Sequence, residues 1–140
     1  TKRIQKPTVL YSNYKNETLN DKSVFVVDTI GLLTKIYNYA DIAYVGGAMG
    51  STGLHNTLEA ATFGVPIVIG KNYKKFPEAK AMLSKGGLFS IRTFASLEST
   101  INMLVNDPKK RVECGQKNKD FIEDNKGASE LIMTELKSRF

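Results

Sequence analysis

A glycine-rich segment in the middle of the chain carries the residues best placed to do chemistry. Residues 46–64 read GGAMGSTGLHNTLEAATFG, in which His55, Asn56 and Glu59 stand at the head of a short, otherwise largely apolar helical pattern. Glycines between a strand and a helix let the backbone approach a phosphate closely. The free N–H groups of a helix start present about half a positive charge to an anion. The segment therefore predicts an anion-binding loop, although a tight strand-to-helix turn without a ligand would also use these glycines.

Asn56 and Glu59 have two interpretations that are compatible in part. In the first, the two side chains form a capping box, in which each satisfies a backbone donor at the helix start. In the second, backbone N–H groups near Asn56 and Thr57 hold a phosphate. The Glu59 carboxylate would then accept hydrogen bonds from the two vicinal hydroxyls of a ribose.

Other kinds of site find less support in the sequence. The glycine spacing is neither GxGxxG nor the GK[ST] of a P-loop, so neither nucleotide fingerprint is present. His55 is the only histidine, and HNTLE is not the HExxH zinc pattern, so no metal and no cofactor is predicted. A lone histidine is typical of a local hydrogen bond. Cys114, in a polar helical segment, is interpreted as structural or merely exposed.

Residues 28–32, DTIGL, form a second locus of interest. Asp28 and Thr29 have side chains that can cap a helix, and an ordinary helix cap is one interpretation. The other is a second helix start that faces the same crevice as residues 46–59. Gly31 costs up to about 1 kcal/mol in a helix interior relative to alanine. Its missing side chain would let a base or a ribose lie against the backbone.

The elements that must position these residues alternate between strand and helix periodicity. Strands are predicted over residues 8–14, 24–27, 42–45, 65–69 and 88–91. Helices are predicted over residues 30–40, 54–63, 77–85, 96–105, 108–124 and 128–140. This order predicts parallel β-α-β units with right-handed crossovers. The expected fold class is α/β, a three-layer doubly wound parallel sheet, in which ligands bind outside the carboxyl ends of the strands.

Length and composition fit one domain over residues 1–140. The single cysteine excludes an intrachain disulfide scaffold, and no apolar run has the roughly 18 residues of a spanning helix. The 20 Lys and Arg exceed the 14 Asp and Glu, and this net charge of +6 favours anionic partners. Lys71, Lys74 and Lys75 follow a predicted strand and could add charge near such a ligand, although most such clusters are solvated faces.

Taken together, these motifs resemble a known family. DTIGLL, followed a few residues later by ADIAYVGGAMGSTGLHNTLEAATFGVPIVIG, is similar to the C-terminal half of the 3-deoxy-D-manno-octulosonic acid (Kdo) transferases. The resemblance covers residues 25–87. It implies a Rossmann-like C-terminal half of a GT-B glycosyltransferase that binds CMP-Kdo for transfer of Kdo to a lipid A precursor in lipopolysaccharide biosynthesis.

The resemblance also implies which residues contact CMP. They are Ile30, Gly31, Leu32, Asn56, Thr57, Leu58 and Glu59. Gly47, Ser51 and His55 are expected to support these contacts. The family's acidic residue after the glycine is Leu32 here, which leaves that position a backbone role only. The Gly-Gly-His-Asn that is frequent in the family is Gly-Leu-His-Asn here, at residues 53–56.

The resemblance places the catalytic glutamate in an N-terminal half that this chain lacks, so no catalytic residue is predicted here. The chain is expected to be a fragment without its acceptor domain and to be inactive alone. The family's Pro-Arg motif is also missing. The resemblance implies peripheral membrane association at the cytoplasmic face of the bacterial inner membrane.

Two alternatives stay open on the sequence. One is the donor domain of another GT-B glycosyltransferase or a nucleotide-sugar epimerase. Another is a nucleotide-binding module without enzymatic activity. Nucleic-acid binding is not predicted, because the basic residues are not interleaved with aromatic residues as a stacking platform would require.

Overall fold

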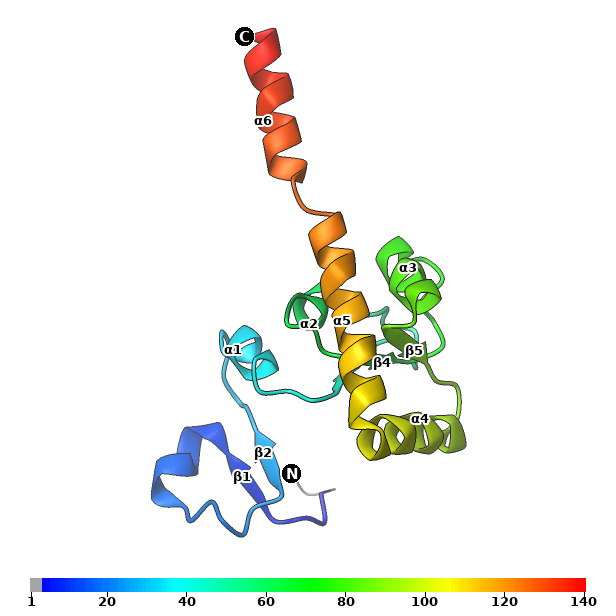
Figure 1. The fold of residues 1–140 in the computed structure, drawn as a ribbon. Coiled ribbons are helices and arrows are strands. Elements are labelled where there is room, and N and C mark those ends of the chain that lie inside the picture. The colour runs from blue at the N-terminus through cyan, green and yellow to red at the C-terminus, as the bar shows by residue number, and fades with distance from the viewer. Residues whose placement is uncertain (1–3) are drawn as a thin grey trace. The chain divides into compact units, whose positions relative to one another are not determined.

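The computed structural model describes residues 4–140, which divide into two compact units, the first ending at Ile36 and the second covering Tyr37–Phe140 (Figure 1). In the first unit, strands β1 (Thr8–Leu10) and β2 (Val24–Val26) pair in parallel, and a 3-10 helix, η1 (Tyr11–Asn16), follows β1. Helix α1 covers Leu33–Tyr37. Among residues 4–140, no helix has both the length and the apolar character needed to cross a bilayer.

Two predictions for the first unit are wrong in part. The strand predicted to run to residue 14 ends at Leu10, because the aromatic residues that follow pack on one another. The rings of Tyr11 and Tyr14 stack with centroids 5.2 Å apart, and both meet Phe25 edge-on. A 3-10 helix eclipses side chains three residues apart, which brings these two rings together.

The helix predicted from residue 30 begins only at Leu33, and Asp28 does not cap it. The Asp28 carboxylate instead accepts hydrogen bonds from the Ser12 amide at 3.0 Å and the Ser12 hydroxyl at 2.6 Å. These hydrogen bonds lower the pKa of Asp28 below its ordinary value. Gly31, at φ 89°, lies in the left-handed region, which interrupts helical geometry before Leu33.

The second unit is built on a three-stranded parallel sheet. Its strands β3 (Ala43–Val45), β4 (Ile67–Ile69) and β5 (Leu88–Ser90) pair in that order, with Ala43 opposite Ile67 and Ile67 opposite Leu88. The helices are α2 (Leu58–Thr62), α3 (Pro77–Lys85), α4 (Phe94–Asn106), α5 (Pro108–Asp124) and α6 (Ala128–Arg139). The predicted α/β fold with helices on a parallel sheet is confirmed.

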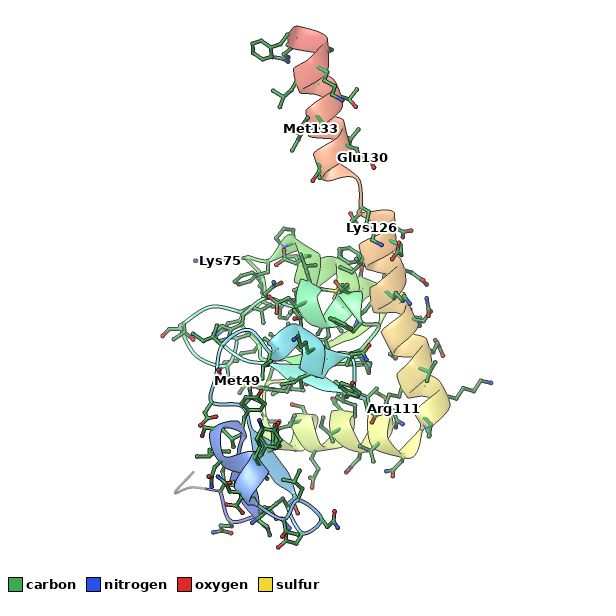
Figure 2. All side chains as sticks on the ribbon, turned by 90° about the vertical axis from the view of Figure 1, so that its left-hand side faces the viewer. Met49, Lys75, Arg111, Lys126, Glu130 and Met133 are labelled. Carbon is green, nitrogen blue, oxygen red and sulfur yellow. The ribbon has the colours of Figure 1, made fainter. Side chains whose placement is uncertain are left out.

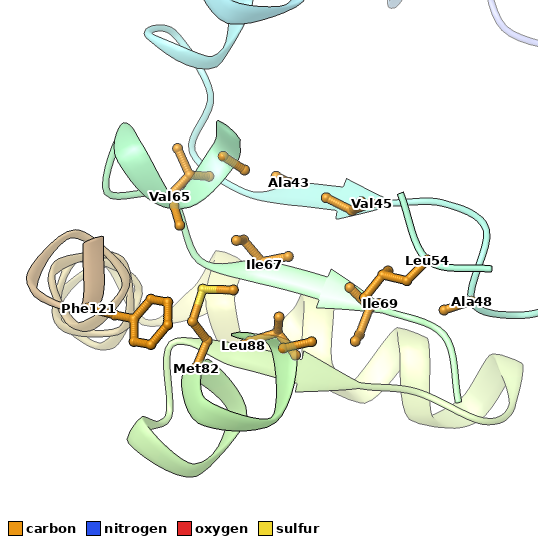
Figure 3. Packing of buried hydrophobic residues seen from close by; sticks show 13 residues of the cluster. Ala43, Val45, Ala48, Leu54, Val65, Ile67, Ile69, Met82, Leu88 and Phe121 are labelled. Atoms are coloured by element: carbon orange, nitrogen blue, oxygen red, sulfur yellow. The ribbon is translucent and has the colours of Figure 1, made fainter. Parts of the chain in front are cut away.

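Helices cover both faces of this sheet because successive side chains of a strand point to opposite faces. Ile67 and Ile69 of β4 pack on one face with Met82 of α3 and Phe121 of α5 (Figure 3). Val68, between the two isoleucines, packs on the other face with Ile91 and with Leu104 of α4. All three residues of β4 are fully buried, which explains their unbroken apolar run. The second unit therefore has three layers.

Candidate functional site

Two loops that follow neighbouring strands are joined at the carboxyl edge of the three-stranded sheet. Residues 46–57 follow β3, and residues 70–76 follow β4. Asn72 connects them: its amide donates to the Ala48 carbonyl, and its side-chain Nδ2 donates to the Gly50 carbonyl, both at 2.8 Å. The sequence predicted the place of this site but missed Asn72, whose only sequence feature is its position three residues after an apolar strand.

Two of the glycines are required by the packing of these loops. A side-chain carbon on Gly47, which has φ 92°, would lie 1.8 Å from the Gly53 carbonyl oxygen. A side-chain carbon on Gly70 would lie 2.4 Å from the Met49 amide nitrogen. Neither position can hold a larger residue while the backbone keeps this course. Gly47 therefore has a structural role, because it lets the loop fold back on itself.

A cleft of about 520 Å³ opens between the two loops. It is lined by Gly50, Ser51, Gly53, Lys71, Asn72, Lys74, Lys75 and Phe76. No carboxylate is among these lining residues, and no ion pair within residues 4–140 involves the three lysines. Figure 2 shows the Lys75 side chain extending away from the ribbon. We refer to this feature as the lysine cleft.

The head of α2 shows half of the predicted capping box. Asn56 Oδ1 accepts from the Leu58 amide at 3.0 Å, as a cap does. Glu59 Oε1, however, accepts from Asn56 Nδ2 at 2.9 Å rather than from a backbone donor. The helix predicted from residue 54 begins at Leu58 for this reason, since Asn56 holds the preceding turn. Asn56 thereby fixes the Glu59 carboxylate at the surface beside the loop.

The surroundings of Glu59 are partly apolar. The Glu59 side chain is half-buried. The pKa of the nearby Tyr37 is raised, chiefly because Tyr37 is partly buried and further because of the negative charge of Glu59. The Tyr37 ring packs against that of Phe63 with centroids 6.2 Å apart. The Glu59 carboxylate can accept hydrogen bonds from hydroxyl groups of a ligand.

The remaining predicted residues of this loop lie at different depths. The Thr57 side chain is only 1% exposed, and its hydroxyl has no hydrogen-bond partner. Leu58 is 39% exposed. Ser51 lines the lysine cleft. His55 donates its backbone amide to the Gly46 carbonyl at 3.1 Å, and its exposed ring lies beside Gly47. The interpretation of the His55 side chain as a local hydrogen-bonding group stays a prediction.

Ile30, Gly31 and Leu32 belong to the first unit. The Ile30 side chain is fully exposed, and a side-chain carbon on Gly31 would meet nothing within 4 Å. These residues thus present an open backbone and an apolar side chain to solvent. Their contact with a nucleotide stays a prediction.

Asn118 and Cys114 are buried residues of α5. Asn118, which is fully buried, donates from Nδ2 to the carbonyls of Val65 and Gly87, both at 2.8 Å. It lies at helical spacing from the buried Cys114 and Phe121, so it is a polar residue on an otherwise apolar helix face. This pattern indicates a buried hydrogen-bonding residue, which the sequence analysis did not identify. The Cys114 thiol is buried and not exposed, and burial raises its pKa.

Comparison with known proteins places this geometry in a wider context. No family model matches the chain. The chain is 33% identical over 125 residues to the 3-deoxy-D-manno-octulosonic acid transferase of Haemophilus influenzae. This alignment covers 87% of the chain and 29% of that protein. The chain is 28% identical over 127 residues to the enzyme of the same name from Chlamydophila psittaci, which covers 89% of the chain and 29% of that protein. The chain thus spans less than a third of these relatives.

A solved structure shares the fold. The C-terminal CMP-Kdo binding domain of WaaA from Acinetobacter baumannii matches with a TM-score of 0.73 at 18% identity, over 84% of this chain and 61% of that one. The likeness confirms the predicted Rossmann-like α/β fold.

Proposed function

We propose, from the membership of this chain in the 3-deoxy-D-manno-octulosonic acid transferase family, that it binds the activated donor sugar of a glycosyltransferase. The observation that carries the proposal is the similarity to a named transferase over 87% of the chain. The solved domain of the same fold is described as binding CMP-Kdo. The proposed donor is therefore CMP-Kdo, and the proposed acceptor is a lipid A precursor of lipopolysaccharide.

The loop after β3 and the head of α2 supply the proposed nucleotide site. Glu59, held by Asn56 at 2.9 Å, would accept from the vicinal ribose hydroxyls of CMP. Backbone N–H groups near Asn56 and Thr57 would hold the phosphate, since the Leu58 amide already donates to Asn56 Oδ1. Ile30, Gly31 and Leu32 of the first unit would contact the same nucleotide through their backbone. Among these residues, only Asn56 and Glu59 have side-chain chemistry that selects a nucleoside.

In the proposed mechanism, this chain binds and stabilises the leaving group, CMP. As the bond between the sugar and the phosphate breaks, negative charge grows on CMP, and backbone N–H groups fixed in advance stabilise it without rearranging. Deprotonation of the acceptor hydroxyl belongs to the part of the relatives that this chain does not span. A lipid acceptor implies peripheral work at the membrane surface, which we place at the cytoplasmic face of the bacterial inner membrane.

Calorimetric titration of the 140-residue chain with CMP and with UDP tests the proposal. We expect CMP to bind and UDP to bind more weakly. Glu59→Ala should weaken CMP binding by about tenfold or more, because hydrogen bonds to a charged group contribute about 1.5–3 kcal/mol. Glu98→Ala, on an exposed position of α4, is the matched control and should bind CMP like the parent chain.

Other outcomes would point elsewhere. A clear preference for UDP would contradict the Kdo assignment and favour another nucleotide-sugar enzyme. CMP binding that Glu59→Ala leaves within a factor of two would remove Glu59 from the site.

A further inference from the structure

We propose that the lysine cleft binds the carboxylate of the donor's acidic sugar, so that Lys71, Lys74 and Lys75 select an acidic sugar over a neutral one. The inference rests on the proposed function, because it assigns the sugar end of the same donor. It adds a subsite to the nucleotide contacts described above.

The charge of the cleft is the first argument. Three lysine residues are among those that line one cleft of about 520 Å³, no lining residue is a carboxylate, and none of the three lysines has an ion-pair partner within residues 4–140. Like charges gathered around a concave surface raise the local concentration of anions. Glu78, in the first turn of α3, is the acidic residue nearest in the chain, and it does not line the cleft.

The rigidity of the cleft is the second argument. Asn72 stands between Lys71 and Lys74 in the chain and is fixed by two hydrogen bonds of 2.8 Å to the opposite loop. The Phe76 amide closes the same loop by donating to the Tyr73 carbonyl at 2.9 Å. The backbone from which the lysines extend is therefore held before a ligand arrives, which lowers the entropic cost of binding.

The walls of the cleft suit a sugar. The half-buried ring of Phe76 faces Gly53, where an added side-chain carbon would lie 3.8 Å from the ring. Ser51 contributes a hydroxyl, and Gly50 and Gly53 leave the space open. An apolar wall with a few polar groups, in a cleft of this volume, is typical of a small-molecule site.

The position of the cleft fits the sugar end of the donor rather than the nucleoside. Gly53, at its wall, precedes Asn56 by three residues, but Asn56 and Glu59 do not line the cleft. A nucleotide bound at Asn56 and Glu59 would leave the cleft to whatever is joined to its phosphate. In the proposed donor, that group is a sugar acid.

The test compares CMP with CMP-Kdo by calorimetry on the 140-residue chain and on the double variant Lys74→Met, Lys75→Met. We expect the parent chain to bind CMP-Kdo about tenfold or more tightly than CMP, and the double variant to bind both alike, with its CMP affinity unchanged. The control variant Lys80→Met, Lys109→Met changes the net charge equally at two exposed helix positions outside the cleft. It should retain the preference for CMP-Kdo.

Each contrary result has a distinct meaning. If the double variant retained the preference for CMP-Kdo, the inference would be overturned while the proposed function stood. If CMP affinity fell together with that for CMP-Kdo, the lysines would hold the phosphate, which also overturns the inference. If the parent chain bound neither compound, the proposed function itself would fail.

Discussion

At the scale of single residues, Asn118 is a fully buried polar residue that joins helix α5 to the sheet by hydrogen bonds. Its Nδ2 serves two carbonyls, that of Val65 just before β4 and that of Gly87 just before β5. The Gly87 carbonyl also accepts from the Ile67 amide at 3.1 Å, so the Val65 carbonyl is the acceptor that depends on this side chain. A buried acceptor without a partner costs about 1–3 kcal/mol.

We therefore expect Asn118→Leu to lower the free energy of unfolding by about 1–3 kcal/mol, since it leaves the Val65 carbonyl unpaired while the Gly87 carbonyl keeps the Ile67 amide as its donor. Urea denaturation followed by circular dichroism measures this change. Gln116→Leu, at an exposed position on the same helix, is the matched control and should change stability by less than about 0.5 kcal/mol. An Asn118→Leu variant as stable as this control would show that the two hydrogen bonds contribute nothing.

At the scale of elements, the site depends on how closely two loops approach. Gly70 lies against the backbone of Ala48 and Met49, which leaves no space for a side chain. We expect Gly70→Ala to push the loops apart, with a loss of about 1–3 kcal/mol in stability and weaker CMP binding. Thermal unfolding and calorimetry measure the two effects.

Gly50→Ala is the matched control for that prediction. Gly50 lines the same cleft, but an added side-chain carbon there meets nothing within 4 Å. This variant should keep the stability of the parent chain. Equal behaviour of the two variants would contradict the argument that loop packing requires a glycine at position 70.

Helices with local boundary residues were predicted well from the sequence. Helix α3 begins at Pro77 and ends before Gly86 at φ 82°, and α5 begins at Pro108 after the Asp107 cap, all as expected. The boundaries that failed depend on partners distant in sequence. Asp28 accepts hydrogen bonds from Ser12, sixteen residues away, and the residues next to Asp28 in the sequence do not indicate this partner.

The candidate site was predicted in the same uneven way. The glycine loop after a buried strand and the pairing of Asn56 with Glu59 have local patterns, and both are found in the structure. The anchoring role of Asn72 and the burial of Thr57 depend on how two loops meet. No spacing rule within one loop contains that information.

At the scale of the whole molecule, the proposed nucleotide contacts are divided between the two units. Ile30, Gly31 and Leu32 belong to the first unit, and Asn56 and Glu59 to the second. The similarity to the Haemophilus influenzae and Chlamydophila psittaci transferases covers 87% and 89% of the chain, so it includes part of each unit.

A crystal structure of the chain with CMP bound tests the central claim most directly. We expect the ribose hydroxyls to donate hydrogen bonds to the Glu59 carboxylate, the phosphate to lie against the backbone N–H groups near Asn56 and Thr57, and Gly31 to face the nucleotide. A nucleotide found elsewhere on the chain, or a Glu59 carboxylate turned away from it, would contradict the account.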